Sequence, residues 1–310
     1  MSKFSLFFGA ATALVTPFEQ DGALDLESFR KLLRFQLDSG IDALLVCGTT
    51  GETPTLSDEE CQILLKETVK ATDHGVPVIM GVGSNCTAHA VEKARSAEKN
   101  GADALLAVTP YYNKCTPEGL VRHYREIAAA TSLPIIVYTV PSRTGMTIPP
   151  SVLGELFAIP NVIGIKDATG DIAYGAQFLS HFTGEVCLWS GNDNATLPLL
   201  SLGSDGVISV LSNIKPKETS RLCHAFAEGR IQEAQALSAS LLPLADTLFC
   251  EVNPIPVKAA LSLMGICKPY CRMPLTTASE GTFKRIERLL ISLRENDSRL
   301  APNDNPPKAE

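Results

Sequence analysis

Eight short apolar segments, each followed by a helical pattern, recur along this 310-residue chain. The segments are nearly continuous apolar runs, which is typical of strands that are covered on both faces. The predicted strands are Ala11–Thr16, Ala43–Cys47, Val76–Gly81, Ala104–Thr109, Ile135–Val140, Val162–Lys166, Val186–Ser190 and Gly206–Val210. Eight consecutive strand–helix units restrict the fold to a closed parallel barrel or a doubly wound sheet.

The segments between the strands carry helix start and stop signals. Asp25–Ser39 places apolar residues on one face and is followed by Gly40, which favours a helix end. Ser57 and Glu60 form the sequence pattern of a capping box, and Thr116 before a proline predicts another helix start. The count and regular spacing of these units favour a (β/α)8 TIM barrel over the doubly wound sheet.

Helical patterns continue after the eighth predicted strand. We expect residues 1–215 to form the barrel core through strand eight. Residues 216–295 should hold the last barrel helix and a C-terminal helical extension, which is more helix than a minimal barrel needs. Residues 296–310 are polar and proline-rich, which predicts a disordered tail.

The composition argues against several classes of protein. Apolar residues make up 45% of the chain and the formal net charge is −7, without a long Lys/Arg cluster. A nucleic acid or an anionic membrane is therefore not the expected partner. No apolar run reaches the roughly 18 residues of a membrane span. Nine cysteines without CxxC spacing predict reduced thiols in a cytoplasmic protein rather than a disulfide framework.

Active sites of such barrels lie at the carboxyl ends of the strands. Lys166 closes the apolar sixth strand, where it could pair with Asp167 or act as a desolvated amine that attacks a carbonyl. Tyr138 ends the fifth strand, where it could be a core aromatic or could transfer protons. Arg143 follows in a loop, where it could be solvated or could hold a carboxylate.

Two further loops at the same rim carry weaker signals. Gly48–Glu52, with the sequence GTTGE, combines glycines that allow close backbone approach with hydroxyl and N–H groups that could bind a carboxylate. Thr109–Asn113 follows the fourth strand and adds two adjacent tyrosines, Tyr111 and Tyr112. Neither loop is diagnostic by itself.

Other chemistries lack their sequence patterns. The five histidines show no HxH or HExxH spacing, so we expect no metal site. There is no P-loop, no complete GxGxxG dinucleotide motif and no GxSxG nucleophile elbow. Lysine-based chemistry therefore remains the best-supported hypothesis.

Six motifs together resemble the dihydrodipicolinate synthase / N-acetylneuraminate lyase family over nearly the whole barrel. They are GTTGE (Gly48–Glu52), TPYYNK (Thr109–Lys114), VYTVPSRTG (Val137–Gly145), GIKDATG (Gly164–Gly170), GVISV (Gly206–Val210) and NPIPVK (Asn253–Lys258). The resemblance implies a Schiff-base condensation of pyruvate with an aldehyde. PSRTG, which sialic-acid lyases lack, favours the synthase branch and L-aspartate 4-semialdehyde as the aldehyde. The implied product is 4-hydroxy-tetrahydrodipicolinate, formed in the first committed step of the diaminopimelate route to lysine.

The resemblance also implies which residues catalyse the reaction. Lys166 is expected to form the imine with pyruvate, and no bound cofactor is expected. Tyr138, Thr50 and Tyr112 are expected to form a proton relay. Tyr112 would be supplied by the adjacent subunit, and the implied assembly is a homotetramer built as a dimer of dimers.

Three further positions match substrate-binding residues of the family. Thr49, together with Thr50, is expected to hold the pyruvate carboxylate, and Arg143 is expected to bind the semialdehyde. The carbonyl group of Ile208 is expected to face the site. The physical argument agrees, because an amine is nucleophilic only when neutral and an apolar strand favours the neutral form.

The chain departs from the family at the position where inhibited members bind lysine. Asn85 and Tyr111 match that allosteric site. His89 stands where those members carry an acidic residue, and Asp58 and Cys61 stand where they often carry histidines. Because a neutral or cationic imidazole binds an ammonium group poorly, we expect weak inhibition by lysine or none.

Three alternatives stay open from the sequence. The chain could be another pyruvate-dependent aldolase or lyase of the same family that acts on a sugar acid or an oxo acid. It could be a catalytically inactive barrel with a binding role, although every catalytic position is intact. It could also use its lysine to hold pyridoxal phosphate.

Overall fold

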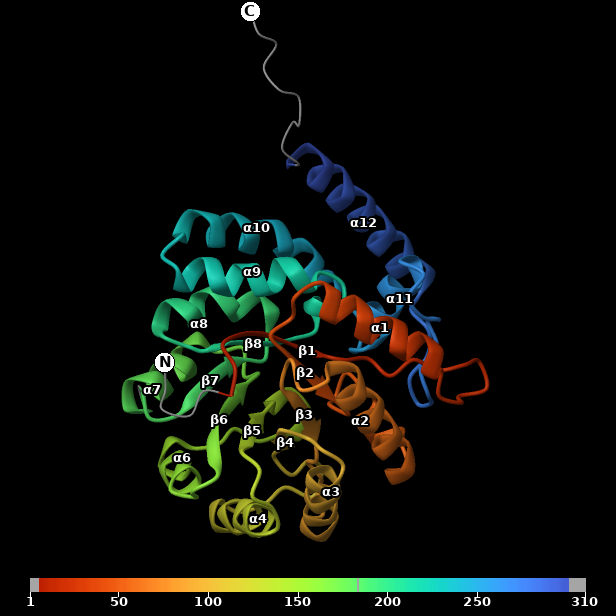
Figure 1. Ribbon diagram of the computed structural model, residues 1–310. Helices are drawn as coiled ribbons and strands as arrows, with labels where there is room; N and C mark the ends of the chain where they lie inside the picture. Colours follow the sequence, from red (N-terminus) through yellow and green to blue (C-terminus); the bar gives the residue numbers. More distant parts are fainter. Residues whose placement is uncertain (1–5, 183, 301–310) are drawn as a thin grey trace, which may run out of the picture.

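The computed structural model of the chain describes residues 6–182 and 184–300. Eight parallel strands close into a barrel in chain order, with the last strand paired to the first (Figure 1). The strands are β1 (Gly9–Ala13), β2 (Ala43–Val46), β3 (Val78–Gly81), β4 (Ala104–Val108), β5 (Ile135–Thr139), β6 (Val162–Asp167), β7 (Cys187–Ser190) and β8 (Gly206–Ser209). The predicted (β/α)8 barrel is therefore confirmed.

One long helix follows each strand and covers the outside of the barrel (Figure 1). These helices are α1 (Leu26–Asp38), α2 (Asp58–Thr72), α3 (Thr87–Lys99), α4 (Pro117–Ala129), α6 (Pro150–Phe157), α7 (Ile172–Phe182), α8 (Thr196–Leu202) and α9 (Pro216–Ala227). The remaining helices are the short α5 (Pro141–Thr144) and the later α10 (Ile231–Thr247), α11 (Ile255–Leu263) and α12 (Glu280–Leu300). Three single 3₁₀ turns cover Thr53–Thr55, Asp193–Ala195 and Leu211–Asn213.

The predicted helix starts are present as hydrogen-bonded caps. The Asp25 carboxylate accepts from the N–H of Ser28 at 3.0 Å, at the start of α1. Ser57 and Glu60 form the reciprocal capping box of α2. The Thr116 hydroxyl caps α4, just before a first-turn proline. Each cap satisfies a backbone donor that would otherwise lack a partner, so these helix boundaries could be read locally.

The barrel separates two apolar layers. Its interior holds mostly small and branched side chains, with the rings of Phe7 and Trp189 stacked at 4.9 Å. A larger layer lies between the strands and the surrounding helices. Close strand contact requires glycine in places: Gly206 has φ +137°, and a Cβ there would lie 1.9 Å from the Gly9 carbonyl oxygen. The interior is thus packed, and open space is left only toward the strand ends.

The first strand differs from its predicted range. We predicted Ala11–Thr16, whereas β1 covers Gly9–Ala13. Residues after Ala13 leave the sheet because other groups bind them: Val15 donates to the side chain of Asn213 at 3.3 Å, and Thr16 donates to the Gly51 carbonyl at 2.7 Å. Both partners are distant in sequence, so a local apolar pattern could not have revealed them.

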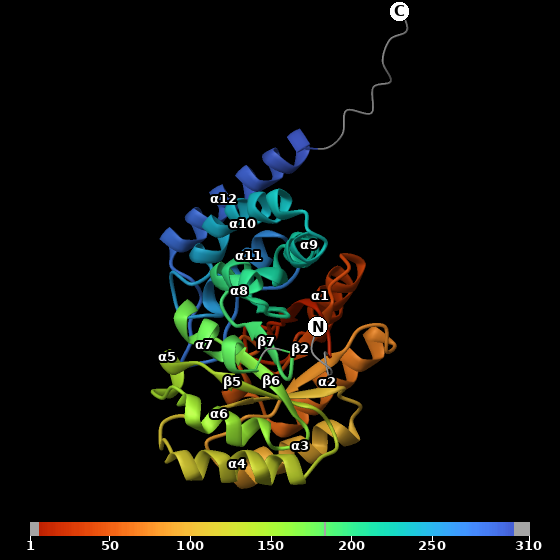
Figure 2. The same ribbon diagram turned by 90° about the vertical axis from the view of Figure 1, so that its left-hand side faces the viewer.

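The helices α9–α12 gather on one side of the barrel, as both views show (Figures 1 and 2). Helix α10 packs against α9 and α12, and α12 also packs against α11. We expected the helix to end at Glu295 and a disordered tail to begin at residue 296, but α12 runs to Leu300. Polar residues cost an exposed helix at most about 0.7 kcal/mol each, so polarity alone does not end it. Residues 301–310 lie outside the described residues.

Candidate active site

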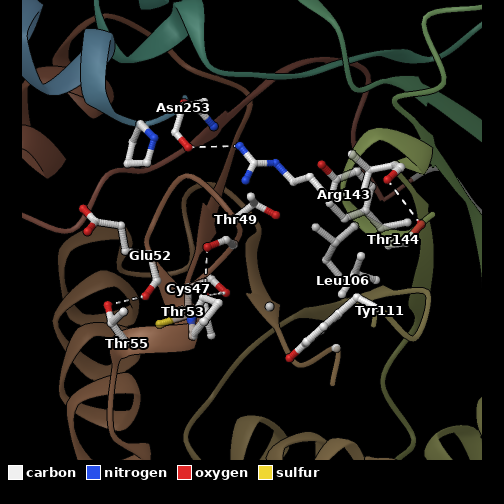
Figure 3. Close-up of a pocket in the computed structure, with 18 of the residues that line it drawn as sticks. Cys47, Thr49, Glu52, Thr53, Thr55, Leu106, Tyr111, Arg143, Thr144 and Asn253 are labelled. Carbon is white, nitrogen blue, oxygen red and sulfur yellow. Dashed lines mark hydrogen bonds between the residues drawn. The ribbon is translucent and has the colours of Figure 1, made fainter. Parts of the chain in front are cut away.

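A cavity of about 340 Å³ opens at the carboxyl ends of the strands, where the sequence placed the site (Figure 3). Three residues predicted to bind or react with substrate line it: Thr49, Tyr138 and Arg143. Tyr111, which was expected at the allosteric site, also lines it. Lys166, Thr50 and Ile208 are not among the wall residues, although Lys166 contacts Tyr138 directly. The predicted residues that line the cavity therefore come from the ends of three strands, β2, β4 and β5.

Lys166 occupies the inner side of the barrel wall. In the ladder of β5 and β6 it pairs with Tyr138, and its Nζ lies 4.5 Å from the centre of the tyrosine ring. Successive strand residues point to opposite faces, so Asp167 points the other way and binds the N–H of Thr169 at 2.8 Å. In the described part of the chain no carboxylate forms an ion pair with Lys166, so the structural hypothesis of a Lys166–Asp167 pair is wrong.

The environment of Lys166 favours its neutral form. The side chain is 5% exposed, and burial lowers the pKa of its amine to about 8. The negative charge of Asp193 opposes this shift, and the positive charge of Arg143 adds to it. At pH 7 about one tenth of the amine is therefore neutral, roughly 300-fold more than for a lysine of ordinary pKa, and the neutral form is the one that attacks a carbonyl.

We expect the rate of imine formation to follow this ionisation. Below about pH 8 the neutral fraction of Lys166 falls about tenfold for each pH unit, so the second-order rate constant for pyruvate should rise with pH and level off above that value. Stopped-flow measurement of imine formation against pH tests this.

Two variants test which charges set the midpoint of the expected pH profile. Asp193→Asn removes the charge that raises the pKa of Lys166, so the midpoint of the profile should move to lower pH. Arg143→Ala removes the opposing charge and should move the midpoint to higher pH. A midpoint that stays unchanged in both variants would contradict this account of the pKa.

The loop after β2 presents its two threonines in different ways. Thr50 is buried and its hydroxyl accepts from the side-chain amide of Asn253 at 3.0 Å. Thr49 is less buried and lines the cavity. The loop closes on itself through the Thr53 hydroxyl, which donates to the Gly48 carbonyl at 2.8 Å. This local turn holds Thr49 at the cavity wall, while the adjacent Thr50 is buried against Asn253.

Tyr138 is the second titratable group at the cavity. Burial raises the pKa of its hydroxyl, while the charge of Arg143 and the nearby hydroxyl of Thr49 oppose that rise. A protonated phenol next to a neutral amine can donate to an oxygen that becomes negative during a reaction. Lys166 and Tyr138 thus have complementary roles available to them.

The remaining predicted positions are not brought to the cavity within this chain. Tyr112 is 92% exposed and adopts a left-handed backbone conformation with φ +67°. Ile208 is fully buried in β8. His89 is exposed on α3, and the backbone of Asn85 accepts from the side chain of Asn113 at 3.0 Å. One subunit therefore brings Lys166, Tyr138 and Arg143 close to one another. It leaves Tyr112, the third member of the expected relay, away from them.

The comparisons with known proteins agree with the motifs. The family model described as the dihydrodipicolinate synthetase family matches residues 6–292. The chain belongs to this family. It is 47% identical to the 4-hydroxy-tetrahydrodipicolinate synthase of Thermotoga neapolitana, over 92% of this chain and 98% of that protein.

Solved structures of family members superpose closely on this chain. The dihydrodipicolinate synthase of Thermotoga maritima is 44% identical with a TM-score of 0.91, over 93% of this chain and 99% of that one. The chloride-inhibited enzyme of Acinetobacter baumannii, solved with pyruvate, is 42% identical with a TM-score of 0.90, over 92% and 98%.

Asn253 is one residue that the sequence did not single out as part of the site. Its side chain donates to Thr50, and its backbone carbonyl accepts from Arg143 at 3.0 Å (Figure 3). It therefore connects the two groups expected to bind the two substrates. Its side-chain oxygen is buried and has no hydrogen-bond partner within the described residues. The NPIPVK motif was visible in the sequence, but its contact with the GTTGE loop was not.

Asp193 and the pair Glu52–Lys258 were also missed. Asp193 accepts from the N–H groups of Val210 and Leu211 at 3.1 and 3.0 Å, which fixes a carboxylate between β7 and β8. Glu52 and Lys258 form an ion pair in which the lysine side chain is fully buried. Such pairings depend on which strand ends become neighbours, so no local sequence pattern predicts them.

Within residues 6–182 and 184–300, no group of three or more His, Cys, Asp or Glu side chains has the geometry to hold a metal ion. In the same residues, no helix combines the length and apolar character needed to cross a membrane.

Proposed function

We propose that this chain is a 4-hydroxy-tetrahydrodipicolinate synthase, which condenses pyruvate with L-aspartate 4-semialdehyde. The observation that carries the proposal is Lys166, a desolvated amine at a barrel strand end, in contact with Tyr138 and next to a cavity that also presents Arg143. The name of the relatives and the pyruvate in the A. baumannii structure support the same reaction.

The first half of the proposed reaction forms an enamine on Lys166. The neutral amine attacks the carbonyl carbon of pyruvate, and the carbonyl oxygen leaves as water after protonation. Tyr138, whose ring contacts Lys166, is the proposed donor for that protonation. The cationic imine then withdraws electrons, so the methyl group loses a proton and the enamine forms. Thr49 at the cavity wall and Thr50, the next residue of the same loop, are the proposed hydroxyl groups for the pyruvate carboxylate.

The second half forms the carbon–carbon bond. The enamine carbon attacks the aldehyde carbon of the semialdehyde, and the aldehyde oxygen takes up a proton through the hydroxyl relay. Water or the semialdehyde's own amino group then attacks the imine carbon and frees Lys166. No bound cofactor is needed, because the imine itself acts as the electron sink.

Arg143 is the proposed anchor of the semialdehyde carboxylate. A guanidinium group binds a carboxylate through two parallel hydrogen bonds, and the Asn253 carbonyl orients this side chain. We expect Arg143→Ala to raise the KM for the semialdehyde about 100-fold, since a charge-assisted contact contributes about 2–3 kcal/mol. The KM for pyruvate should change much less. Steady-state kinetics with each substrate varied in turn measures both, and a pyruvate effect as large as the semialdehyde effect would contradict the role.

A paired assay tests the function as a whole. Pyruvate consumption is followed with the semialdehyde in one tube and N-acetylmannosamine in another. Turnover with the semialdehyde alone supports the synthase proposal. Turnover with the amino sugar alone would favour the alternative of a sugar-acid lyase. Absorbance of the purified protein near 400 nm would instead indicate pyridoxal phosphate.

The proposed assembly is a homotetramer made of two dimers, in the cytoplasm. Tyr112 is the supporting residue, because it is 92% exposed beside Tyr111 of the cavity wall, and a large exposed aromatic side chain gains a role when a second subunit covers it. No disulfide joins any of the nine cysteines, which all lie in the described residues, as expected in a reducing compartment. Sedimentation analysis measures the assembly.

We also propose that lysine inhibits this enzyme weakly or not at all. His89 is exposed on α3 in the region where inhibited relatives carry an acidic residue, so an ammonium group would lack its carboxylate partner. We expect less than half-inhibition at lysine concentrations of about 1 mM. His89→Glu should increase the sensitivity. Steep inhibition of the unaltered protein at micromolar lysine would contradict this prediction.

A further inference from the structure

Two cysteines lie in contact beside the cavity. Cys47 follows β2 directly and lines the cavity, and Cys61 lies in the first turns of α2. The Cys47 thiol donates to the Cys61 carbonyl oxygen at 3.9 Å, so the Cys47 side chain lies against Cys61. Both are free and both are buried in this structure. The fold therefore presents two thiols to each other although they are fourteen positions apart in the chain.

The groups around the pair shift the pKa values of the two thiols in opposite directions. The hydrogen bond from Cys47 and the positive charge of Lys93 lower the pKa of the Cys61 thiol, against the opposing effects of burial and of nearby acidic groups. The same hydrogen bond and burial raise the pKa of the Cys47 thiol. Lys93 also lines the cavity. Cys61 is consequently the thiol that ionises first, and Cys47 stands next to it as a proton donor.

Other cysteines of the chain lack this combination. Burial raises the pKa of Cys267 and of Cys271 to about 12, and neither lines the cavity. Cys223 is fully buried, and its pKa is raised further by nearby carboxylates. Cys250 is exposed and its thiol faces the hydroxyl of Thr282. In the described residues, the pair Cys47–Cys61 combines a contact between two cysteines, a lowered thiol pKa at Cys61 and, at Cys47, a side chain that lines the cavity.

We propose that Cys47 and Cys61 are a modification site, at which peroxide closes a reversible disulfide that weakens the binding of pyruvate. The Cys61 thiolate attacks one peroxide oxygen, the O–O bond breaks, and Cys61 becomes a sulfenic acid while hydroxide leaves. The Cys47 sulfur then attacks the Cys61 sulfur and water leaves. Two thiols are oxidised in total and one hydrogen peroxide is reduced to two water molecules.

The position of Cys47 explains why a disulfide with Cys61 would disturb the loop that carries Thr49 and Thr50. Cys47 has φ +52°, and its carbonyl oxygen accepts from the Thr53 hydroxyl at 2.5 Å. The same oxygen packs against β3 so closely that a Cβ on Gly81 would lie 2.0 Å away. Pulling the Cys47 sulfur to the 2.05 Å or so of a disulfide disturbs these contacts, and Gly48 and Thr49 follow next in the chain. This consequence rests on the proposed role of Thr49 and Thr50 in holding pyruvate.

Peptide mapping tests the bond independently of any activity. Both cysteines lie in one tryptic fragment, residues 35–66, whereas cleavage after glutamate separates them at Glu52, Glu59 and Glu60. After peroxide treatment of the full chain, the tryptic fragment should be lighter by two hydrogen atoms. The two glutamate-specific fragments should stay joined until a thiol reductant is added. Cys47→Ser and Cys61→Ser should each abolish the link, and Cys250→Ser, an exposed control, should retain it.

Pyruvate binding tests the consequence. Oxidation should raise the pyruvate concentration needed for half-maximal borohydride trapping on Lys166 about tenfold, and dithiothreitol should restore it. Cys61→Ser should bind pyruvate like the reduced protein before and after peroxide. Separate fragments after oxidation, or a joined pair with unchanged pyruvate binding, would overturn the proposal. A reduced protein that never traps pyruvate would instead refute the proposed function, while the mapping still reports on the bond.

Discussion

Replacing Lys166 by alanine is expected to lower turnover by at least about 10³-fold and to abolish borohydride trapping of pyruvate. The reason is chemical rather than structural, since no other amine in the described residues both lies at a strand end of the cavity and contacts Tyr138. Lys166→Arg should be as inactive, because a guanidinium group keeps its charge and cannot attack a carbonyl. Mass spectrometry of the trapped protein and steady-state kinetics provide the measurements.

A control separates this effect from loss of the fold. Lys284→Ala removes an exposed lysine of α12 that pairs only with Glu280 one helical turn away, so activity and trapping should persist. Circular dichroism should show the same spectrum for all variants. If Lys166→Ala retained pyruvate trapping, the nucleophile would have to be a different lysine and the central proposal would fail.

The largest expected effect on stability is at Lys258. Replacement by methionine should lower the free energy of unfolding by about 3–5 kcal/mol, because it leaves the Glu52 carboxylate buried without its partner cation. In the native chain, the Lys258 ammonium pairs with Glu52 and also donates to the Tyr270 carbonyl at 2.7 Å. It lies 4.2 Å from the centre of the Phe18 ring as well. Urea denaturation, with the signal of Trp189, measures the loss.

A second substitution shows whether the loss comes from an unpaired charge. Glu52→Gln in the Lys258→Met background should recover part of the stability, since it removes the buried carboxylate that lost its partner. Lys268→Met provides a matched control, because Lys268 and Glu19 form a lysine–glutamate pair that is exposed, and its loss should leave the midpoint nearly unchanged. A double variant less stable than either single variant would contradict the explanation.

The buried pair Glu52–Lys258 also helps to hold the loop Gly48–Glu52 in place. Glu52 ends the GTTGE motif, and its second carboxylate oxygen accepts from the N–H of Arg272 at 2.9 Å. The Arg272 guanidinium in turn binds Glu60 of α2 with a shortest distance of 2.5 Å. The loop that carries Thr49 and Thr50 is therefore tied to the chain's C-terminal third. We infer that the C-terminal extension holds the loop of Thr49 and Thr50 in position, in addition to adding helices to the barrel.

The order and type of the barrel elements could be predicted because their causes are local. Apolar runs, capping residues and glycine stops act over a few positions, so Ser57 and Thr116 identified their helices without any knowledge of neighbours. The same locality allowed Lys166, Tyr138 and Arg143 to be placed at one rim, since the carboxyl ends of all strands in a parallel barrel face the same way.

The errors and omissions arose where distant segments meet. The first strand ends early because Asn213 and Gly51 bind the residues that follow it. Asn253 reaches Thr50 across 203 positions, and Lys258 reaches Glu52 across 206. A polar side chain has no intrinsic preference for one remote partner over another until the barrel closes and removes water from both.

The sequence by itself determined eight strand–helix units, the barrel they build and the rim at which a lysine, a tyrosine and an arginine meet. Only the tertiary structure decided that the lysine is buried enough to lower the pKa of its amine to about 8, and that Cys47 touches Cys61. It alone decided that Asn253 connects the two substrate-binding groups. The physical reason is that propensities and caps act along the chain, whereas desolvation, charge coupling and hydrogen-bond partners depend on what the fold brings alongside.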